Sequence, residues 1–109
     1  MTTIAERNQQ RSNCITLRNY IRDLDESEFD MSTYTHCISG HFSKIFGPHK
    51  DDINLMTKLG ITHQQVLELV MPSGWSRPEK CRYTKDQAVD VLTQLIETGE
   101  FTWPPPQPV

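Results

Sequence analysis

The chain has no long apolar run. No stretch approaches the ~18 consecutive apolar residues of a transmembrane helix, and the N-terminal segment Met1–Asn8 has no apolar core like that of a secretory signal. These two absences disfavour membrane-inserted and exported proteins. We therefore expect the protein to be cytoplasmic in the cell that makes it.

Cysteine is scarce, and its spacing is as informative as its number. The three cysteines, Cys14, Cys37 and Cys81, lie far apart and form no Cys-x-x-Cys pair. An even-numbered set at short spacings would instead indicate the disulfide framework of a secreted protein. We expect reduced thiols, each packed as a small apolar side chain.

The chain also lacks an excess of positive charge. It has 11 lysine and arginine residues and 14 aspartate and glutamate residues, which gives a net charge of -3 and a pI near 5.7. A protein that coats nucleic acid usually needs a basic face, so this balance disfavours that class, although a local basic patch is still compatible with it. The length of 109 residues, with 36% hydrophobic and 23% charged residues, fits one globular domain.

Helical periodicity is what the chain does have. From Thr3 to about Leu24, apolar residues recur at spacings of three and four, so they share one helical face. These residues are Cys14, Leu17, Ile21 and Leu24. The part of this helix before Cys14, residues 6–11, is almost wholly polar. We expect it to be either a solvated extension or an arm that packs only on a partner.

A second helix is predicted to be capped by Ser32 or Thr33 and to end at Gly47. The acidic stretch before it, residues 23–31, has no helical period and is expected to form a turn. The apolar face of the second helix would comprise Cys37, Ile38, His41, Phe42 and Ile45.

Three shorter segments complete the prediction. A helix that stops at Gly60 is followed by two helices that open with capping boxes, at 62–65 and 84–87, and the last helix ends at Gly99. Prolines 104–106 cannot be helical. The predicted fold is all-α: a compact bundle of four to five short helices over residues 1–103, with an extended Pro-rich tail at 104–109.

A basic and aromatic segment near the last helix is the leading candidate binding surface. Residues 75–85 have a local charge of +3 in an acidic protein, and arginine and aromatic side chains dominate binding hot spots. The ordinary alternative is that Trp75 covers the edge of the core and the charges are solvated. The predicted partner-binding residues are Trp75, Arg77, Lys80, Arg82, Tyr83 and Lys85.

Residues 53–70 suggest a second possibility. Two short helices that meet at Gly60 resemble a helix-turn-helix, whose second helix can enter the DNA major groove. His63, Gln64 and Gln65 would then be the DNA-binding residues. However, this helix has Glu68 and no lysine or arginine, so it lacks the phosphate attraction that dominates such binding. An ordinary core hairpin is the more frequent explanation of this pattern.

Chemistry at Cys37 and His41 is the third possibility. Four residues apart, they could supply two zinc ligands from one helical face, but the second ligand pair of a structural site is missing. A cysteine nucleophile would also need a base and an oriented third group, and no such set is evident. We therefore expect no enzyme activity, no catalytic residue and no cofactor, with metal binding kept as an alternative.

The short motifs at residues 29–31, 37–41, 59–62 and 83–88, read together, resemble those of a group of small, uncharacterised bacterial and phage proteins. The resemblance covers roughly residues 14–103. Proteins of that group often have a Cys-Gly-Thr-x-x-Cys-x-x-Gly pattern, of which this chain matches only the second cysteine, at Cys37. The motif at 83–88 is followed by further residues that carry the resemblance, which are Leu95, Ile96, Gly99, Glu100 and Trp103.

The resemblance implies an accessory gene of a phage or prophage and no particular reaction. Combined with the basic segment at 75–85, it predicts a non-catalytic protein that binds and occludes a host macromolecule. A host protein, such as a component of a defence system, is the expected partner, and nucleic acid is the alternative. A homo-oligomer formed through the polar first helix stays open, whereas no membrane partner is expected.

Overall fold

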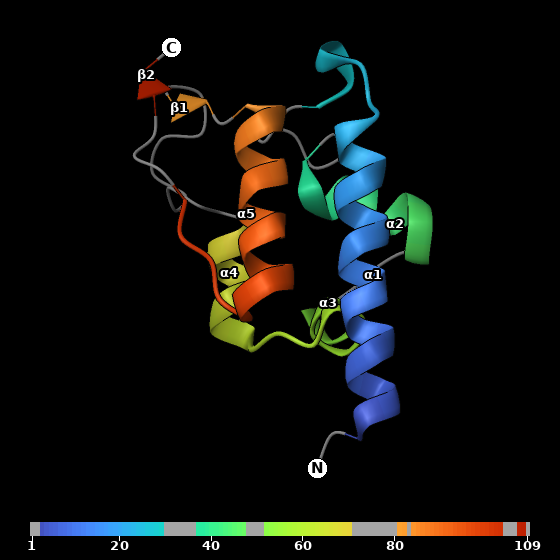
Figure 1. Cartoon of the computed structure of the whole chain (residues 1–109). Coiled ribbons are helices and arrows are strands. Elements are labelled where there is room, and N and C mark those ends of the chain that lie inside the picture. Colours follow the sequence, from blue (N-terminus) through green and yellow to red (C-terminus); the bar gives the residue numbers. More distant parts are fainter. Residues whose placement is uncertain are drawn as a thin grey trace.

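The computed structural model describes residues 3–29, 37–47, 52–70, 81–82, 84–103 and 107–108. Over these ranges the fold is all-α, as predicted, and Figure 1 shows the helices gathered into one bundle. None of the helices described is long and apolar enough to cross a membrane. The helices are α1 (Ile4–Arg22), α2 (Ile38–Phe46), α3 (Asp52–Leu59), α4 (His63–Val70) and α5 (Lys85–Thr98), with a 3-10 turn η1 (Glu26–Glu28) after α1.

The two longest helices, α1 and α5, pack side by side and run antiparallel (Figure 1). The start of α5 lies at the end of α1, where Lys85 contacts Arg22, and Ile96 near its other end contacts Arg11. Helices α2 and α3 pack on α1, and α4 contacts both α2 and α3. Two short strands, β1 (Cys81–Arg82) and β2 (Gln107–Pro108), pair antiparallel, with Arg82 opposite Gln107.

The predicted apolar faces form the core. Cys14, Leu17 and Ile21 of α1 are buried, and Leu24 is partly buried against them. The last helix supplies Ala88, Val91, Leu92 and Leu95, as its spacing indicates. Trp103 is partly buried against the same cluster. Burial of this many apolar side chains is the main driving force for the bundle.

The predicted helix ends are mostly confirmed. The Thr84–Gln87 capping box is complete, and Thr62 and Gln65 exchange the two bonds of the same motif at the start of α4. Gly47, Gly60 and Gly99 follow the last residues of α2, α3 and α5 with positive φ angles, a conformation that favours glycine.

The predicted start of the second helix is wrong. Helix α2 begins at Ile38, and its N-cap is Cys37, whose backbone is extended and whose side chain makes no capping bond. Ser32 and Thr33 lie outside the described residues. Cys37 nevertheless belongs to the buried face with Ile38, His41 and Phe42, as predicted. The helix begins at Ile38 because the backbone of Cys37 is extended, so a single helix cannot run from Ser32 or Thr33 to Phe46.

The polar segment at residues 6–11 is exposed except at Gln10, as a solvated extension would be, but Gln10 and Arg11 contact α3 and α5. Gln10 donates to the carbonyl of Thr57, Asn13 donates to that of Lys58, and the Cys14 thiol donates to that of Leu59 at the C-terminal end of α3. The donor–acceptor distances are 3.2, 2.8 and 3.6 Å. The last carbonyls of a helix have no N–H partner within it. These side chains supply the donors that a further turn of α3 would have provided.

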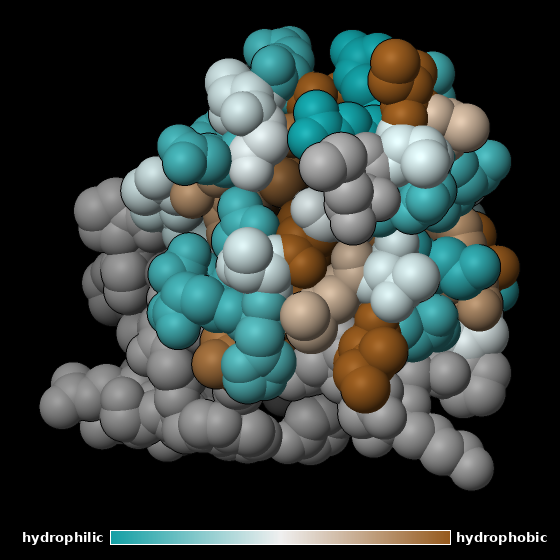
Figure 2. Space-filling view, turned by 90° about the horizontal axis from the view of Figure 1, so that it is seen from below, coloured by the Kyte–Doolittle hydropathy of each residue, from teal (hydrophilic) through white to brown (hydrophobic). Residues whose placement is uncertain are grey.

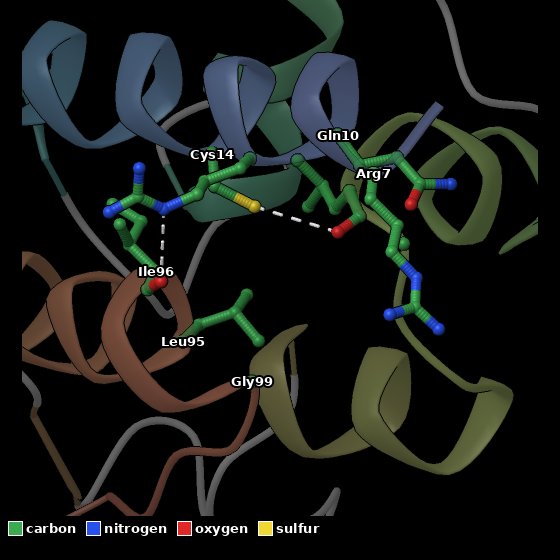
Figure 3. A pocket seen from close by; sticks show the side chains of 9 residues that line it. Arg7, Gln10, Cys14, Leu95, Ile96 and Gly99 are labelled. Carbon is green, nitrogen blue, oxygen red and sulfur yellow. Dashed lines mark hydrogen bonds between the residues drawn. The ribbon is translucent and has the colours of Figure 1, made fainter. Parts of the chain in front are cut away.

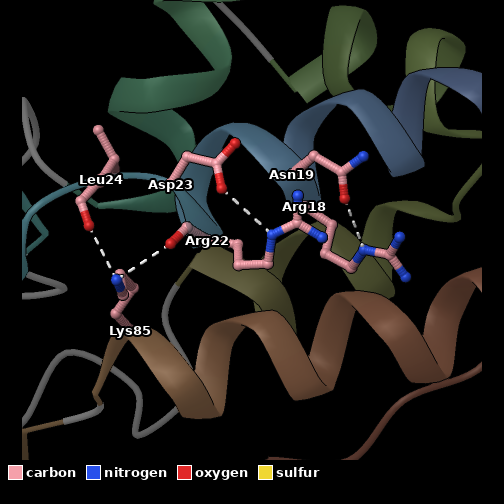
Figure 4. Close-up of polar contacts among 6 residues, drawn as sticks. All are labelled: Arg18, Asn19, Arg22, Asp23, Leu24 and Lys85. Carbon is pink, nitrogen blue, oxygen red and sulfur yellow. Dashed lines mark hydrogen bonds and ion pairs between the residues drawn. The ribbon is translucent and has the colours of Figure 1, made fainter.

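A lysine donates in the same way to the carbonyls at the C-terminal end of α1. Figure 4 shows Lys85, the first residue of α5, reaching across to the end of α1. Its Nζ donates to the carbonyls of Arg22 and Leu24 at 3.0 and 2.8 Å. A cation at a helix C-terminus is also favoured by the helix dipole. The charge of Lys85 helps to lower the pKa of the nearby Asp25 carboxyl, after the larger effect of hydrogen bonds from Ser27.

Replacing Gly60 with alanine should lower the free energy of unfolding by about 2 kcal/mol or more. The left-handed conformation costs a residue with a Cβ roughly 1–2 kcal/mol. A Cβ at this position would also lie 2.5 Å from Gln10 Oε1 and 3.2 Å from Gln10 Cβ. The bond from Gln10 to Thr57 would therefore be displaced. Urea denaturation measures the loss.

Gly99→Ala is the matched control, because Gly99 has a similar φ of 80° but no atom within 4 Å of the position that a Cβ would take. We expect it to cost only about 1 kcal/mol. In a Gln10→Ala background the cost of Gly60→Ala should fall towards that of Gly99→Ala. Equal losses for the two single alanine variants would contradict the close approach of Gln10 to Gly60.

Replacing Lys85 with methionine should destabilise the protein by about 1.5–3 kcal/mol, the usual range for hydrogen bonds that involve a charged group. The carbonyls of Arg22 and Leu24 would lose their shared donor. Lys44→Met is the control, because Lys44 is an exposed lysine in the last turn of α2 whose side chain makes no bond to the described part of the chain. Thermal denaturation showing no difference between the two variants would refute the capping role of Lys85.

Candidate binding groove

The described structure has a groove where the first half of α1 meets the C-terminal ends of α3 and α5 (Figure 3). Its volume is about 370 Å³, within the usual range of roughly 300–1,000 Å³ for small-ligand sites. Figure 2 views this end of the molecule and shows apolar atoms reaching the surface between hydrophilic side chains. The lining residues are Arg7, Gln10, Arg11, Cys14, Leu59, Gly60, Leu95, Ile96 and Gly99.

The local sequence explains how α1 supplies one wall. Arg7, Arg11 and Cys14 follow one another at spacings of four and three, so they extend the buried stripe of α1 to its polar end. The helix starts at Ile4 because the Thr3 side chain accepts a bond from the Glu6 backbone N–H. This face of α1 therefore changes from apolar at the buried Cys14 to cationic at the exposed Arg11 and Arg7.

The electrostatics of the groove are set by two arginines and two helix ends. Arg11 Nε donates to the carbonyl of Ile96 at 3.4 Å, the bond drawn to Ile96 in Figure 3. The guanidinium of Arg7 makes no hydrogen bond or ion pair with any described residue. Both arginine side chains are exposed. Opposite them stand the partially negative C-terminal ends of α3 and α5.

The floor of the groove is apolar and chemically inert. Leu59 and Leu95 are buried, and Ile96 is partly buried beside them. Burial raises the pKa of the Cys14 thiol from 9.0 to about 11. The thiol therefore stays protonated at neutral pH, where it serves as a weak donor to Leu59. No lining residue can take or give a proton near pH 7.

The partner-binding residues predicted from the sequence lie mostly beyond the described structure. Trp75, Arg77, Lys80 and Tyr83 fall outside it, and Arg82 is described only as part of β1. Lys85 is partly buried, and two of its three N–H donors are used within the chain. In this position it joins α5 to the end of α1.

The predicted DNA-reading residues stand at the start of α4, after a turn at Gly60 as the helix-turn-helix pattern requires. His63 and Gln64 are exposed, and Gln64 donates to Glu68 on the next turn. Gln65 uses its side-chain amide for the structure: it accepts from Thr62 and donates to Gly99 at 3.0 Å. At Gln65 the carbonyl oxygen and one amide hydrogen, the kind of pair that would read an adenine edge, therefore already bond within the chain.

Cys37 and His41 are both buried. The Cys37 thiol contacts Ser39 Oγ at 3.7 Å, and His41 Nε2 lies 2.8 Å from the Glu28 carbonyl. The His41 ring also contacts the rings of Tyr20 and Phe29. Among the residues described, no three histidine, cysteine or acidic side chains gather where they could hold a metal ion.

No family model, curated protein or solved structure matches the chain. The groove must therefore be interpreted from its own chemistry. The sequence prediction overlooked Arg7 and Arg11 because it treated residues 6–11 as one polar segment. The signal that could have identified them is the spacing that joins Arg7 and Arg11 to Cys14, together with the two glycines that end α3 and α5.

The Cys14 thiol should resist alkylation in the folded protein. At pH 8 iodoacetamide should modify Cys14 only when urea is present, because a thiol with a pKa of about 11 has almost no thiolate at that pH. Peptide mass spectrometry identifies the modified cysteine. Rapid modification of Cys14 under native conditions would contradict the burial described above.

The same raised pKa makes stability depend on pH. Below pH 9 the thiol is neutral in both folded and unfolded chains, whereas above pH 9 only the unfolded chain ionises readily. Stability should therefore fall between pH 9 and about 11, by on the order of 2 kcal/mol. A Cys14→Ser variant lacks this titration, so its stability should fall less over the same interval.

Proposed function

We propose that this protein is a non-catalytic, phage-type accessory protein that binds and occludes a host protein, with a component of a defence system as one candidate partner. The observation that carries the proposal is the exposed guanidinium of Arg7 at the mouth of the groove, without an ion pair among the described residues. Arginine is enriched in the energetic centres of protein interfaces. An arginine held at a groove without an internal structural bond is available to a partner.

The composition of the groove supports binding rather than a reaction. General acid–base catalysis needs a group that titrates near the working pH. The groove offers two permanently charged guanidinium groups, one amide, one protonated thiol, aliphatic side chains and two glycines. These groups can hold and orient a ligand, and they lack an evident means of transferring its protons at pH 7.

The surrounding charge favours a protein partner over nucleic acid. The whole chain has a net charge of -3, and the ends of α3 and α5 add partial negative charge at the groove. A polyphosphate backbone would be repelled by both, whereas an acidic side chain needs only the local arginines. The segment 75–85 is proposed as a second contact with the same partner, because it combines a local charge of +3 with Trp75 and Tyr83.

Affinity capture from a bacterial host lysate tests the proposal. The wild-type protein should retain a specific host protein, and Arg7→Glu should lose it by charge repulsion at the groove. Arg77→Glu combined with Arg82→Glu should also weaken retention if the segment 75–85 contributes. Quantitative mass spectrometry of the retained proteins measures each outcome.

Arg22→Glu is the matched control, since it makes the same charge change on α1 at the opposite end from Arg7. Its own contact is an exposed ion pair with Asp23, which is worth little to stability. It should capture the same host protein as the wild type. Equal capture by all variants would exclude both proposed surfaces, and no specific capture by the wild type would overturn the proposed function.

A further inference from the structure

We infer that the groove between α1, α3 and α5 is a carboxylate-binding site that accepts an acidic side chain of the partner, flanked by aliphatic residues. The inference rests on the proposed function, because it names the chemical group that the partner would insert. It depends on three features of the groove: the two guanidinium groups, the apolar floor and the helix ends that border it.

The guanidinium groups supply the charge. Arg7 and Arg11 are one turn apart on α1, and both line the groove. The bond from Arg11 to Ile96 uses Nε and therefore leaves both terminal amino groups of that guanidinium. Figure 3 shows the Arg7 side chain extending from α1 across one side of the groove. A guanidinium binds a carboxylate through two parallel N–H bonds, which adds direction to the attraction.

The floor of the groove can pack against aliphatic residues that flank the acidic residue of the partner. Leu59, Leu95 and Ile96 present hydrocarbon, and the protonated Cys14 thiol adds a weakly polar surface. Gly99 leaves the mouth open, since nothing lies within 4 Å of where its side chain would begin. A glutamate between two leucines could therefore place its carboxylate on the Arg7 guanidinium, which lies on the opposite side of the groove from the arginine bonded to Ile96, and a leucine on the floor.

The helix ends decide which anion fits. Leu59 and Gly60 at the C-terminal end of α3 border one side of the groove, and Ile96 and Gly99 at the end of α5 border another, so the partial negative charge of both helix ends lies beside it. These partial negative charges oppose a dianionic phosphate more strongly than a singly charged carboxylate. A C-terminal carboxylate is usually held by clustered backbone N–H groups, whereas the groove presents helix carbonyls. An internal acidic side chain is the anion that satisfies both constraints.

Titration of the isotope-labelled full chain with short blocked peptides tests the inference by NMR. The first probe is acetyl-Leu-Glu-Leu-amide, and its neutral counterpart is acetyl-Leu-Gln-Leu-amide. The glutamate peptide should shift the backbone signals of Gly60, Gly99 and Ile96, and should bind at least about tenfold more tightly than the glutamine peptide. Added salt should weaken this binding because the arginines are exposed.

Two further peptides distinguish the source of the charge. Acetyl-Leu-Leu with a free C-terminus and acetyl-Leu-phosphoserine-Leu-amide should both bind more weakly than the glutamate peptide. Tighter binding of either one would overturn the assignment to an internal carboxylate. No shift of the three groove signals at about 10 mM glutamate peptide, or equal binding of the glutamate and glutamine peptides, would overturn the site itself.

Variants of α1 locate the contact. Arg7→Gln should weaken the glutamate peptide about tenfold, and Arg7→Lys should weaken it less, because lysine keeps the charge but loses the two-pronged geometry. Arg22→Gln, at the opposite end of the same helix, should bind as the wild type does. The unperturbed signals of the rest of the spectrum report that each variant is folded. Equal effects of Arg7→Gln and Arg22→Gln would place the contact elsewhere.

The two proposals can fail separately. Specific capture of a host protein by a chain that does not prefer the glutamate peptide would preserve the proposed function and overturn the carboxylate site. Selective binding of the glutamate peptide without any captured host protein would preserve the carboxylate site and overturn the proposed function.

Discussion

The structure depends on polar side chains that complete the C-terminal ends of distant helices. The last carbonyls of a helix have no N–H partner within it, and leaving such groups buried without a donor is costly. Here the end of α3 is completed by Gln10, Asn13 and Cys14, and the end of α1 is completed by Lys85. These contacts join residues 45 to 63 positions apart. These directional bonds favour one position of each helix along its neighbour, whereas apolar packing alone is not directional.

The same contacts create the groove. Gln10 can reach α3 only because Gly60 has no side chain at the point of closest approach. Asn13 and Cys14 then hold the polar half of α1 against the end of α3, while Arg11 ties it to α5. The first half of α1 and the C-terminal ends of α3 and α5 therefore border an open space. A hollow with a cationic wall and an aliphatic floor is what this arrangement leaves.

The way in which capping side chains form the groove limits what the groove can do. A groove made by capping side chains consists of permanent charges, amides and hydrocarbon, which suit recognition, and its thiol is kept protonated by burial. Arg11, which donates to the Ile96 carbonyl, has a structural role, whereas the guanidinium of Arg7 makes no hydrogen bond or ion pair with any described residue. The difference between two arginines one turn apart is the reason for assigning a partner contact to this end of the bundle.

The sequence by itself determined the elements whose signals are local. The buried stripe of α1, the two capping boxes and the glycines that end α2, α3 and α5 follow from spacing and residue type within a few positions. The all-α class follows from the same signals. Only the tertiary structure decided where α2 begins, since the backbone of Cys37 is extended and a single helix cannot run from the expected polar cap to Phe46.

The tertiary structure also decided the roles of the polar residues. Gln10, Asn13, Gln65 and Lys85 each bond to a carbonyl at least 34 positions away. No local pattern distinguishes such a side chain from a solvated one, because its partner is fixed only once the helices have packed. For the same reason the groove could be anticipated from the sequence no further than the spacing of Arg7, Arg11 and Cys14.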